Sequence, residues 1–477
     1  MDYKNILERD IPNKTALWLL AFIIASFIAI HSLNLKLSIS DENTYFYMGN
    51  LIAQGSVPYK DFFYAHPPLN IFIIALLIKL FGLNLVILKL VPVITTATSA
   101  LLIYLISKNL HSRLSALTAA IFFLFAYETL RVSTYLTGID IATMLLLLAI
   151  YLLFKQNKNN KSYLYSGILL GIAGISALFS LIAAVVIGTI LLLKNKKQAV
   201  YFLIGFSSIF LVVNIILILL FGQSYITPVV KYHFLKPLTG SSLKIIFNIL
   251  VKENWLLVLS PLLILFARDK KKVSALVMIA LAYLLFLMTY KSLFGYYLFI
   301  ILPLLAIIGS YSIFSSIERL KMNPRIILIA LFVIIGIASA LSINRYLNYE
   351  FQNFNNAQEI ANYIKANSNP ETALFGDDSI TPLLALLSER KIAFNHADLN
   401  NFRWRTGLVD TKQTINQIKV EKPVIVTSQV NIPQGTFRYG IDYLDEFHDF
   451  LSKDCKVVKE FKDKWQGYEK VVRLWEC

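Results

Sequence analysis

Charged residues and cysteine are both scarce in this sequence. Only 16% of its 477 residues are charged whereas 57% are hydrophobic, proportions that exclude an ordinary soluble protein. Its two cysteines and six histidines form no cluster with the spacing of a zinc site. No basic and aromatic binding module accompanies the net charge of +16, so we expect no nucleic-acid partner.

Long apolar runs take the place of these features. Stretches near 20 residues recur from Ala16 to Ile343, and each is long enough to cross the hydrocarbon core of a bilayer. The first run is longer than the apolar part of a signal peptide, follows a flank that mixes acids and bases, and lacks an A-x-A cleavage site. The sequence therefore predicts a multi-pass cell-membrane protein whose N-terminus is an uncleaved, cytosolic anchor.

Short clusters of lysine and arginine set the expected topology, because such clusters stay in the cytosol. The five clusters are Lys108 with Arg113; Lys155, Lys158 and Lys161; Lys194, Lys196 and Lys197; Arg268 with Lys270 to Lys272; and Arg319, Lys321 and Arg325. Keeping all five inside requires residues Pro68–Gly82 to form an interfacial helix. It also requires Tyr163–Leu193 to form two short helices, which three glycines would let approach closely. One long tilted span is the alternative for Tyr163–Leu193, and it would invert every later loop.

This topology gives about eleven transmembrane helices in residues 1–343 and an extracytoplasmic domain in residues 344–477. The first outer loop, residues 34–83, then carries Asp41, Glu42, Asp61 and His66. Later outer segments carry Arg131, Asp140, Lys231 and His233. Charges are expensive in the bilayer centre, so their gathering at one rim indicates a site at the membrane surface.

The tail has the composition of a small α/β domain. "NAQEIANYIKANS" and "ITPLLALLSERK" have helical periodicity, whereas "ETALFGDDS" reads as a strand entering a turn shaped by Asp377 and Asp378. "KPVIVTS" reads as a buried strand. The last segment reads as a hairpin whose arms would bring Cys455 close to Cys477. A disulfide and two free thiols both stay open, since nothing in the sequence fixes the register.

The first outer loop carries the most specific pattern. "DENTYFYMGNLIAQGSVPYKDFFYAHPPLNIF" combines an acid pair, a helical stretch, "GSVPYKDF" and "HPPL". It resembles the GT-C superfamily of polyprenyl-phosphate-sugar-dependent glycosyltransferases, near the protein O-mannosyltransferases and aminoarabinose transferases. "RVSTYLTGIDIA" is similar to the second acidic motif of that branch, and "YHFLKP" to its donor-phosphate loop. Many relatives have a lysine near residues 176–180, and this chain has none there.

The resemblance implies transfer of a sugar, most commonly mannose, from a polyprenyl or dolichyl phosphate to an acceptor hydroxyl outside the cell. A lipid phosphate leaves readily as an anion, while a carboxylate takes the proton of the hydroxyl that attacks from the opposite face. We expect Asp41 to be this base in an inverting displacement. Glu42 would tune Asp41, or hold a divalent cation together with Asp140; no other cofactor is expected.

Positive charge must stabilise the departing phosphate. The donor or substrate would be bound by His66, Arg131, Asp140, Lys231, His233 and Lys236. For four of these residues a simpler structural role stays open. His66 would cap the interfacial helix, Asp140 would be the N-cap of the next span, and the two lysines would anchor at the interface.

Another class of protein stays open, namely a lipid or solute transporter or flippase with an outer domain. A transporter would place polar residues near the bilayer midplane and show repeated halves, and neither feature is visible. A sensor or assembly protein is a third alternative. Within the enzyme interpretation the sequence leaves open the sugar, the metal dependence, the oligomeric state and the acceptor, which would be a protein, a lipid-linked glycan or a glycolipid.

Overall fold

A computed structural model describes residues 11–155, 158–238, 240–320, 324–348, 353–433, 435–465 and 468–477. The chain divides into two compact units. The first contains Met1–Leu35, Lys89–Ile216 and Leu238–Asn348, and the second contains Lys36–Leu88, Leu217–Pro237 and Tyr349–Cys477. Two inner segments of the chain therefore belong to the same unit as its C-terminal part.

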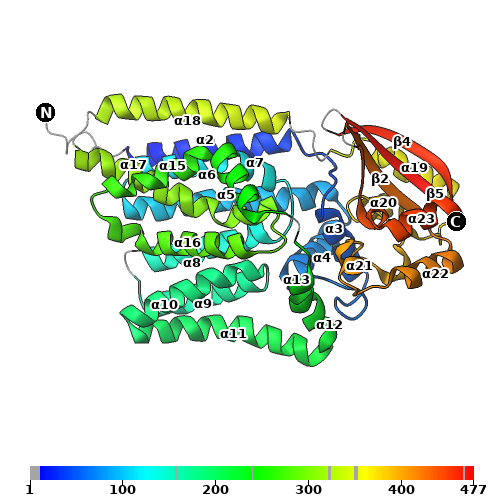
Figure 1. Cartoon of the computed structure of the whole chain (residues 1–477). Coiled ribbons are helices and arrows are strands. Elements are labelled where there is room, and N and C mark those ends of the chain that lie inside the picture. The colour runs from blue at the N-terminus through cyan, green and yellow to red at the C-terminus, as the bar shows by residue number, and fades with distance from the viewer. Residues whose placement is uncertain are drawn as a thin grey trace. The chain divides into compact units, whose positions relative to one another are not determined.

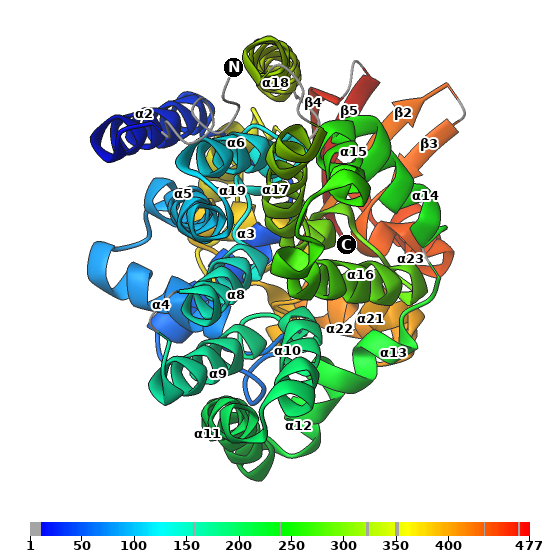
Figure 2. The same cartoon turned by 90° about the vertical axis from the view of Figure 1, so that its left-hand side faces the viewer.

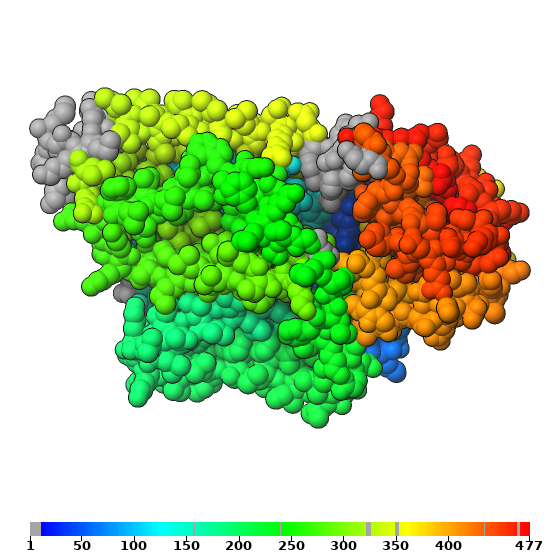
Figure 3. Space-filling view, viewed as in Figure 1, coloured from blue at the N-terminus to red at the C-terminus, as the bar shows by residue number. Residues whose placement is uncertain are grey.

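The first unit consists of helices, which Figure 2 shows roughly end-on and side by side. They are α2 (Asn13–Ser32), α5 (Leu85–Leu110), α6 (Arg113–Leu124), α7 (Tyr127–Val132), α8 (Ile139–Phe154), α9 (Asn160–Gly174), α10 (Leu181–Lys194), α11 (Lys196–Phe221), α14 (Ser242–Ile246), α15 (Trp255–Leu262), α16 (Ser274–Thr289), α17 (Leu302–Leu320) and α18 (Pro324–Leu347). On the face shown in Figure 3, side chains from the green and yellow-green segments after residue 240 form most of the surface of this unit.

Several of these helices have the length and composition of membrane spans. Among the described residues five helices qualify: α2, α5, α11, Lys270–Thr289 and Ile326–Leu347. Residues Ser242–Glu253 and Trp255–Phe266 add a sixth span if this pair, bent by 87°, is counted as one. The multi-pass helical fold is confirmed. Fewer helices reach full span length than the eleven predicted, because several apolar segments form helices of 10–17 residues.

The segment Tyr163–Leu193 forms two helices, as predicted. Helix α9 ends at Gly174 and α10 begins at Leu181, and the two lie side by side in Figures 1 and 2. The predicted role of the glycines is wrong for two of the three. Gly167 faces the backbone carbonyl of Phe202 in α11, and a Cβ on Gly171 would also meet the backbone of α11. Only Gly174 lies against both α10 and α11.

The second unit combines a five-stranded sheet with short helices. The strands are β1 (Leu374–Gly376), β2 (Val424–Ile432), β3 (Gly435–Arg438), β4 (Lys456–Trp465) and β5 (Tyr468–Glu476). Their order is β1-β2-β5-β4, with β3 also paired to β2. Only the β1–β2 pair is parallel among these strands, because the helical crossover between them returns the chain in the same direction.

The helices of this unit come from all three of its segments. They are α3 (Glu42–Ala53), α4 (Leu69–Phe81), α12 (Gln223–Ile226), α13 (Tyr232–Leu235), α19 (Ala357–Asn367), α20 (Thr381–Ser388), α21 (Phe402–Arg405), α22 (Thr411–Glu421) and α23 (Asp445–Asp454). Helix α4 is the helix predicted at Pro68–Gly82. Its 13 residues fall short of the roughly 20 that a span needs.

The final two strands form the predicted hairpin. Lys456 pairs with Glu476 at its open end, so the next residues outward, Cys455 and Cys477, lie opposite each other. The structure joins them in a disulfide with 4.2 Å between their Cα atoms. This covalent bond closes the end of the hairpin away from its turn.

Candidate active site

The acid pair of the first loop lies at the start of α3. Asp41 is the N-cap residue of this helix, and its side chain is partly exposed. Glu42 is completely buried and accepts a 2.5 Å hydrogen bond from the hydroxyl of Ser38. The N-terminus of a helix stabilises negative charge, so this position favours a carboxylate at Asp41. The two adjacent acids therefore have different surroundings.

Contacts within the second unit hold the start of α3 in place. The amide of Asn43 donates to the carbonyl of Ser379 at 2.8 Å, and the hydroxyl of Thr44 donates to the carbonyl of Asp378 at 3.2 Å. Both acceptors follow strand β1 in the C-terminal segment. Asp41 is thus positioned by residues more than 300 positions away in the sequence.

The two histidines of the predicted site lie together in this unit. Nε2 of His66 is 3.0 Å from the hydroxyl of Tyr45, and the rings of His66 and His233 are 5.6 Å apart. His66 does not cap α4, whose N-cap residue is Pro68. Burial, assisted by the charge of Lys236, lowers the pKa of His233 to about 4, and burial lowers that of His66 well below its usual range. Both imidazoles are therefore neutral near pH 7 and supply hydrogen bonds instead of positive charge.

Lys236 supplies a cation to the same region. Only 8% of this residue is exposed, and its amine lies 4.6 Å from the ring centre of Tyr232 and 5.7 Å from that of Phe402. Burial lowers the pKa of Lys236, while the charges of Asp398 and Asp41 act in the opposite direction. The predicted base and a predicted phosphate ligand are therefore close enough to interact electrostatically.

Lys231 has a different environment from Lys236. Its side chain is exposed, and its amine donates a 2.8 Å hydrogen bond to the amide oxygen of Gln223. His233 lies between these two lysines in the sequence, and its Nε2 is 2.6 Å from the backbone carbonyl of Ala65. The structure thus brings Lys236 and His233 to the cluster around His66 and leaves Lys231 at the surface.

Sequence reasoning missed two charged residues of this cluster, Asp398 and Arg403. A guanidinium nitrogen of Arg403 donates to the backbone carbonyl of Asp398, and the guanidinium lies 4.6 Å from the ring centre of Phe63. Burial raises the pKa of Asp398, although Arg403, the backbone N–H of Asn400 and Lys236 oppose this shift. Nothing in "HADLNNFRWR" distinguishes these two residues from ordinary loop charges, so no sequence signal would have found them.

Asp378 was expected only to shape a turn, but it is part of the electrostatic cluster. Burial raises its pKa well above the usual range, and the charges of Asp377, Asp41 and Asp398 raise it further. Asp377 does shape the predicted turn, since its Oδ1 accepts the backbone N–H of Ser379 at 2.8 Å. Burial therefore favours the neutral form of Asp378, as it does for Asp398.

Asp140 and Arg131 belong to the first unit. Asp140 is buried and accepts hydrogen bonds from the Thr95 hydroxyl at 2.8 Å and from the Gly138 backbone at 3.2 Å. Gly138, not Asp140, is the N-cap of α8. Arg131 forms an ion pair with Glu128 at 2.6 Å.

The residues proposed as metal ligands belong to different units, since Glu42 lies in the second unit and Asp140 in the first. Within the described residues, no group of three or more His, Cys, Asp or Glu side chains has the arrangement of a metal site.

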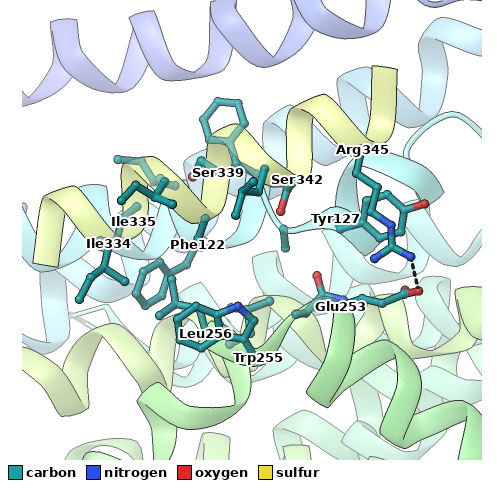
Figure 4. Close-up of a pocket in the computed structure, with 18 of the residues that line it drawn as sticks. Phe122, Tyr127, Glu253, Trp255, Leu256, Ile334, Ile335, Ser339, Ser342 and Arg345 are labelled. Carbon is teal, nitrogen blue, oxygen red and sulfur yellow. Dashed lines mark hydrogen bonds and ion pairs between the residues drawn. The ribbon is translucent and has the colours of Figure 1, made fainter. Parts of the chain in front are cut away.

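The first unit contains a separate cavity of about 410 Å³. Figure 4 shows apolar side chains of α6, α15 and α18 along its length, among them Phe122, Leu256 and Ile334. At one end Arg345 lies 4.1 Å from the ring centre of Tyr127 and forms a 3.0 Å ion pair with Glu253. None of the residues predicted for catalysis or donor binding lines this cavity.

Comparison with known proteins identifies the fold. Residues 65–221 match the family of dolichyl-phosphate-mannose-protein mannosyltransferases. The structure is similar to ArnT of Cupriavidus metallidurans bound to undecaprenyl phosphate, with a TM-score of 0.62, 11% identity and coverage of 97% of this chain and 98% of that one. It is also similar to the oligosaccharyltransferase AglB of Archaeoglobus fulgidus in complex with an inhibitory peptide and a dolichol-phosphate (TM-score 0.56, 11% identity, 89% and 74% covered).

A third similar structure is the arabinofuranosyltransferase AftD from Mycobacteria, with a TM-score of 0.56, 13% identity and coverage of 96% of this chain and 39% of that one. No curated protein matches the sequence. The fold is that of the GT-C superfamily, which confirms the resemblance drawn from the first loop. The chain therefore has the fold of membrane glycosyltransferases of this superfamily.

Proposed function

We propose that the enzyme transfers mannose from a dolichyl or other polyprenyl phosphate to an acceptor hydroxyl at the extracytoplasmic surface, with inversion at the anomeric carbon. The matched family supports mannose as the sugar. The lipid phosphates bound by ArnT and AglB support a polyprenyl carrier. The observation that carries the proposal is the gathering in one unit of Asp41 at the start of α3, the buried Lys236, and the neighbouring rings of His66 and His233.

The proposed reaction is a single displacement. The acceptor oxygen attacks the anomeric carbon as Asp41 takes the hydroxyl proton, because general-base catalysis requires a carboxylate within reach of that proton. The bond between the anomeric carbon and the phosphate oxygen breaks on the opposite side. The phosphate leaves with the bonding electrons and needs no proton, so the carrier is released as an anion.

Other residues of the second unit would stabilise and orient the phosphate. Lys236 stabilises the negative charge that develops on the phosphate, since a preorganised cation in a dry site acts strongly on such charge. The neutral His66 and His233 serve as hydrogen-bond partners that orient the phosphate. Asp398 and Arg403 hold the position of Lys236, and Glu42 stays buried beneath Asp41.

The membrane orientation is also part of the proposal. The positive-inside rule placed residues 34–82, 131–140 and 222–253 and the tail from Asn344 on the outer side. The second unit is built from Lys36–Leu88, Leu217–Pro237 and Tyr349–Cys477, which include most of the first outer loop, the start of the segment after Gly222 and most of the tail. Their association in one compact unit supports a common side for all of them, with the N-terminus in the cytosol.

The test is sugar transfer by the purified protein from dolichyl-phosphate mannose, comparing the wild type with Asp41→Asn. We expect the variant to lose about 10²–10⁴-fold in rate, the usual contribution of a general base. Asp410→Asn is the matched control, because Asp410 is also an N-cap residue in this unit and asparagine caps as well as aspartate. Equal activity of Asp41→Asn and the wild type would remove Asp41 as the base.

A further inference from the structure

The second unit contains a groove distinct from the charged cluster, with a volume of about 800 Å³. One wall comes from α3 and the first loop, and the other from the end of α20 and the chain that follows it. This volume lies in the usual range of ligand pockets, roughly 300–1,000 Å³. Its polar lining from α3, the first loop and the C-terminal segment includes Asn50, Gln54, Ser56, Lys60, Asp61 and Asn395.

Several polar groups in the groove have bonding capacity left over. Within the described part of the chain, no hydrogen-bond partner contacts the side-chain amides of Asn50, Gln54 and Asn395 or the amine of Lys60. Each amide offers two donors and an acceptor. A ligand rich in hydroxyl groups, which both donate and accept, would satisfy this mixture.

The charges of the groove are nearly balanced. The lining contains the cations Lys60, Arg390 and Lys391 and the acids Asp61 and Glu389. The guanidinium of Arg390 already donates hydrogen bonds to the backbone carbonyls of Ser388, Lys365 and Ser368. The remaining mixture lacks the cation excess that a phosphate-rich ligand requires. Polar groups share the lining with apolar side chains such as Leu51, Phe62 and Leu386, and a sugar ring offers both hydroxyl groups and apolar C–H faces. A neutral saccharide is the class of ligand that matches it.

Two segments of the chain connect the walls of the groove with the proposed catalytic cluster. Asn50 lies nine residues after Asp41 on α3, about 13 Å along the helix axis. The opposite wall ends at Ala397, and Asp398 of the cluster is the next residue. The hydroxyl of Tyr47 accepts the backbone N–H of Ile392 at 2.8 Å and ties the walls together.

Unusual backbone conformations also concentrate beside this groove. Among the described residues, five other than glycine have positive φ, and four of them line or adjoin the groove: Tyr59, Glu389, Phe394 and Asn395. Positive φ is rare for bulky side chains such as Tyr59 and Phe394. Strained backbone of this kind occurs preferentially at ligand clamps and active sites.

We propose that this groove binds the saccharide part of the acceptor, at sugar rings beyond the one that carries the reacting hydroxyl. The inference rests on the proposed transferase function and adds that the acceptor is a glycan or glycolipid instead of a peptide. Occupying the groove would place the end of the glycan beside Asp41. Acceptors with several sugar rings would then bind more tightly than single sugars.

The test uses purified enzyme in nanodiscs with dolichyl-phosphate mannose and octyl glycosides of mannose, glucose and N-acetylglucosamine, each with one or three rings. We expect a lower KM for at least one three-ring acceptor than for its one-ring counterpart. The double variant N50A/Q54A should raise that KM about tenfold, the effect of losing one or two hydrogen bonds. Its kcat and its hydrolysis of the donor in the absence of acceptor should stay within about twofold.

The matched control is Q358A/N362A, which removes two exposed amides at the same four-residue spacing on α19. It should leave both KM values unchanged. A wild-type enzyme that hydrolyses or transfers mannose but shows no preference for longer acceptors, or prefers a serine and threonine peptide, overturns this inference and leaves the proposed function intact. Failure to consume the donor at all contradicts the proposed function itself.

Discussion

Replacing Lys236 tests whether the buried cation stabilises the departing phosphate. A unit charge about 4 Å from another contributes roughly 4 kcal/mol at an effective dielectric constant of 20. Loss of one group that stabilises a developing anion typically costs about 10²–10³-fold in kcat. Because Lys236 is only 8% exposed, water cannot replace it, and we expect Lys236→Met to lose activity in this range.

The assay is the initial rate of mannose transfer from dolichyl-phosphate mannose, together with inhibition by dolichyl phosphate. Lys236→Met should weaken both turnover and inhibition, whereas a purely structural defect would lower thermal stability instead. Lys231→Met should lose less than about threefold, since Lys231 is exposed and bonded to Gln223. Lys412→Met, on the exposed surface of α22, controls for the substitution itself.

The pH profile gives a second measurement of the same group. Burial lowers the pKa of Lys236, so the lysine loses its charge at a lower pH than an exposed lysine does. Activity should therefore fall early on the alkaline side. Lys236→Arg should move that fall to higher pH, because arginine stays protonated. Wild-type rates in Lys236→Met, or an alkaline limb that Lys236→Arg leaves in place, would refute the assigned role.

Three further predictions concern stability. Gly167→Ala should lower the thermal unfolding temperature in detergent, because its Cβ would collide with the α11 backbone, while Gly336→Ala, which meets nothing within 4 Å, should not. Reducing the disulfide or replacing Cys455 and Cys477 by serine should cost about 3 kcal/mol for a loop of this length; equal unfolding temperatures with and without reductant would contradict this. Burial, and to a lesser extent Arg403, lowers the pKa of His396 to about 4. The neutral histidine therefore costs no stability above about pH 6.5, whereas the free energy of unfolding falls as the pH drops towards 4. His396→Gln should reduce this acid-dependent loss by up to about 3 kcal/mol.

The neutrality of the two buried histidines changes the chemistry inferred from the loops. Both were candidates for positive charge at the phosphate, and burial makes that role unfavourable for each. In the proposed reaction the positive charge at the phosphate then comes from Lys236, whose position depends on Asp398 and Arg403. The site therefore depends on charges contributed by two separate segments of the second unit.

The class of the protein was predictable from the sequence because its signals are local. Apolar length decides whether a segment can cross a bilayer, and lysine and arginine clusters bias the loops. The first-loop pattern singled out Asp41 and His66 as candidate site residues. Helical periodicity and apolar runs predicted α19, α20, β1, β2 and the final hairpin of the tail, whereas β3, α21, α22 and α23 were not predicted. The break within Tyr163–Leu193 followed from the same charge bias.

Only the tertiary structure decided which of these charges meet and which are buried. Asp398 and Arg403 join Lys236 through contacts between segments far apart in the chain, which no local pattern encodes. Burial and neighbouring charge set the protonation of a side chain, and both depend on the packed neighbours. For the same reason Glu42 is buried while Asp41 is partly exposed, and Gly167 faces α11 instead of α10.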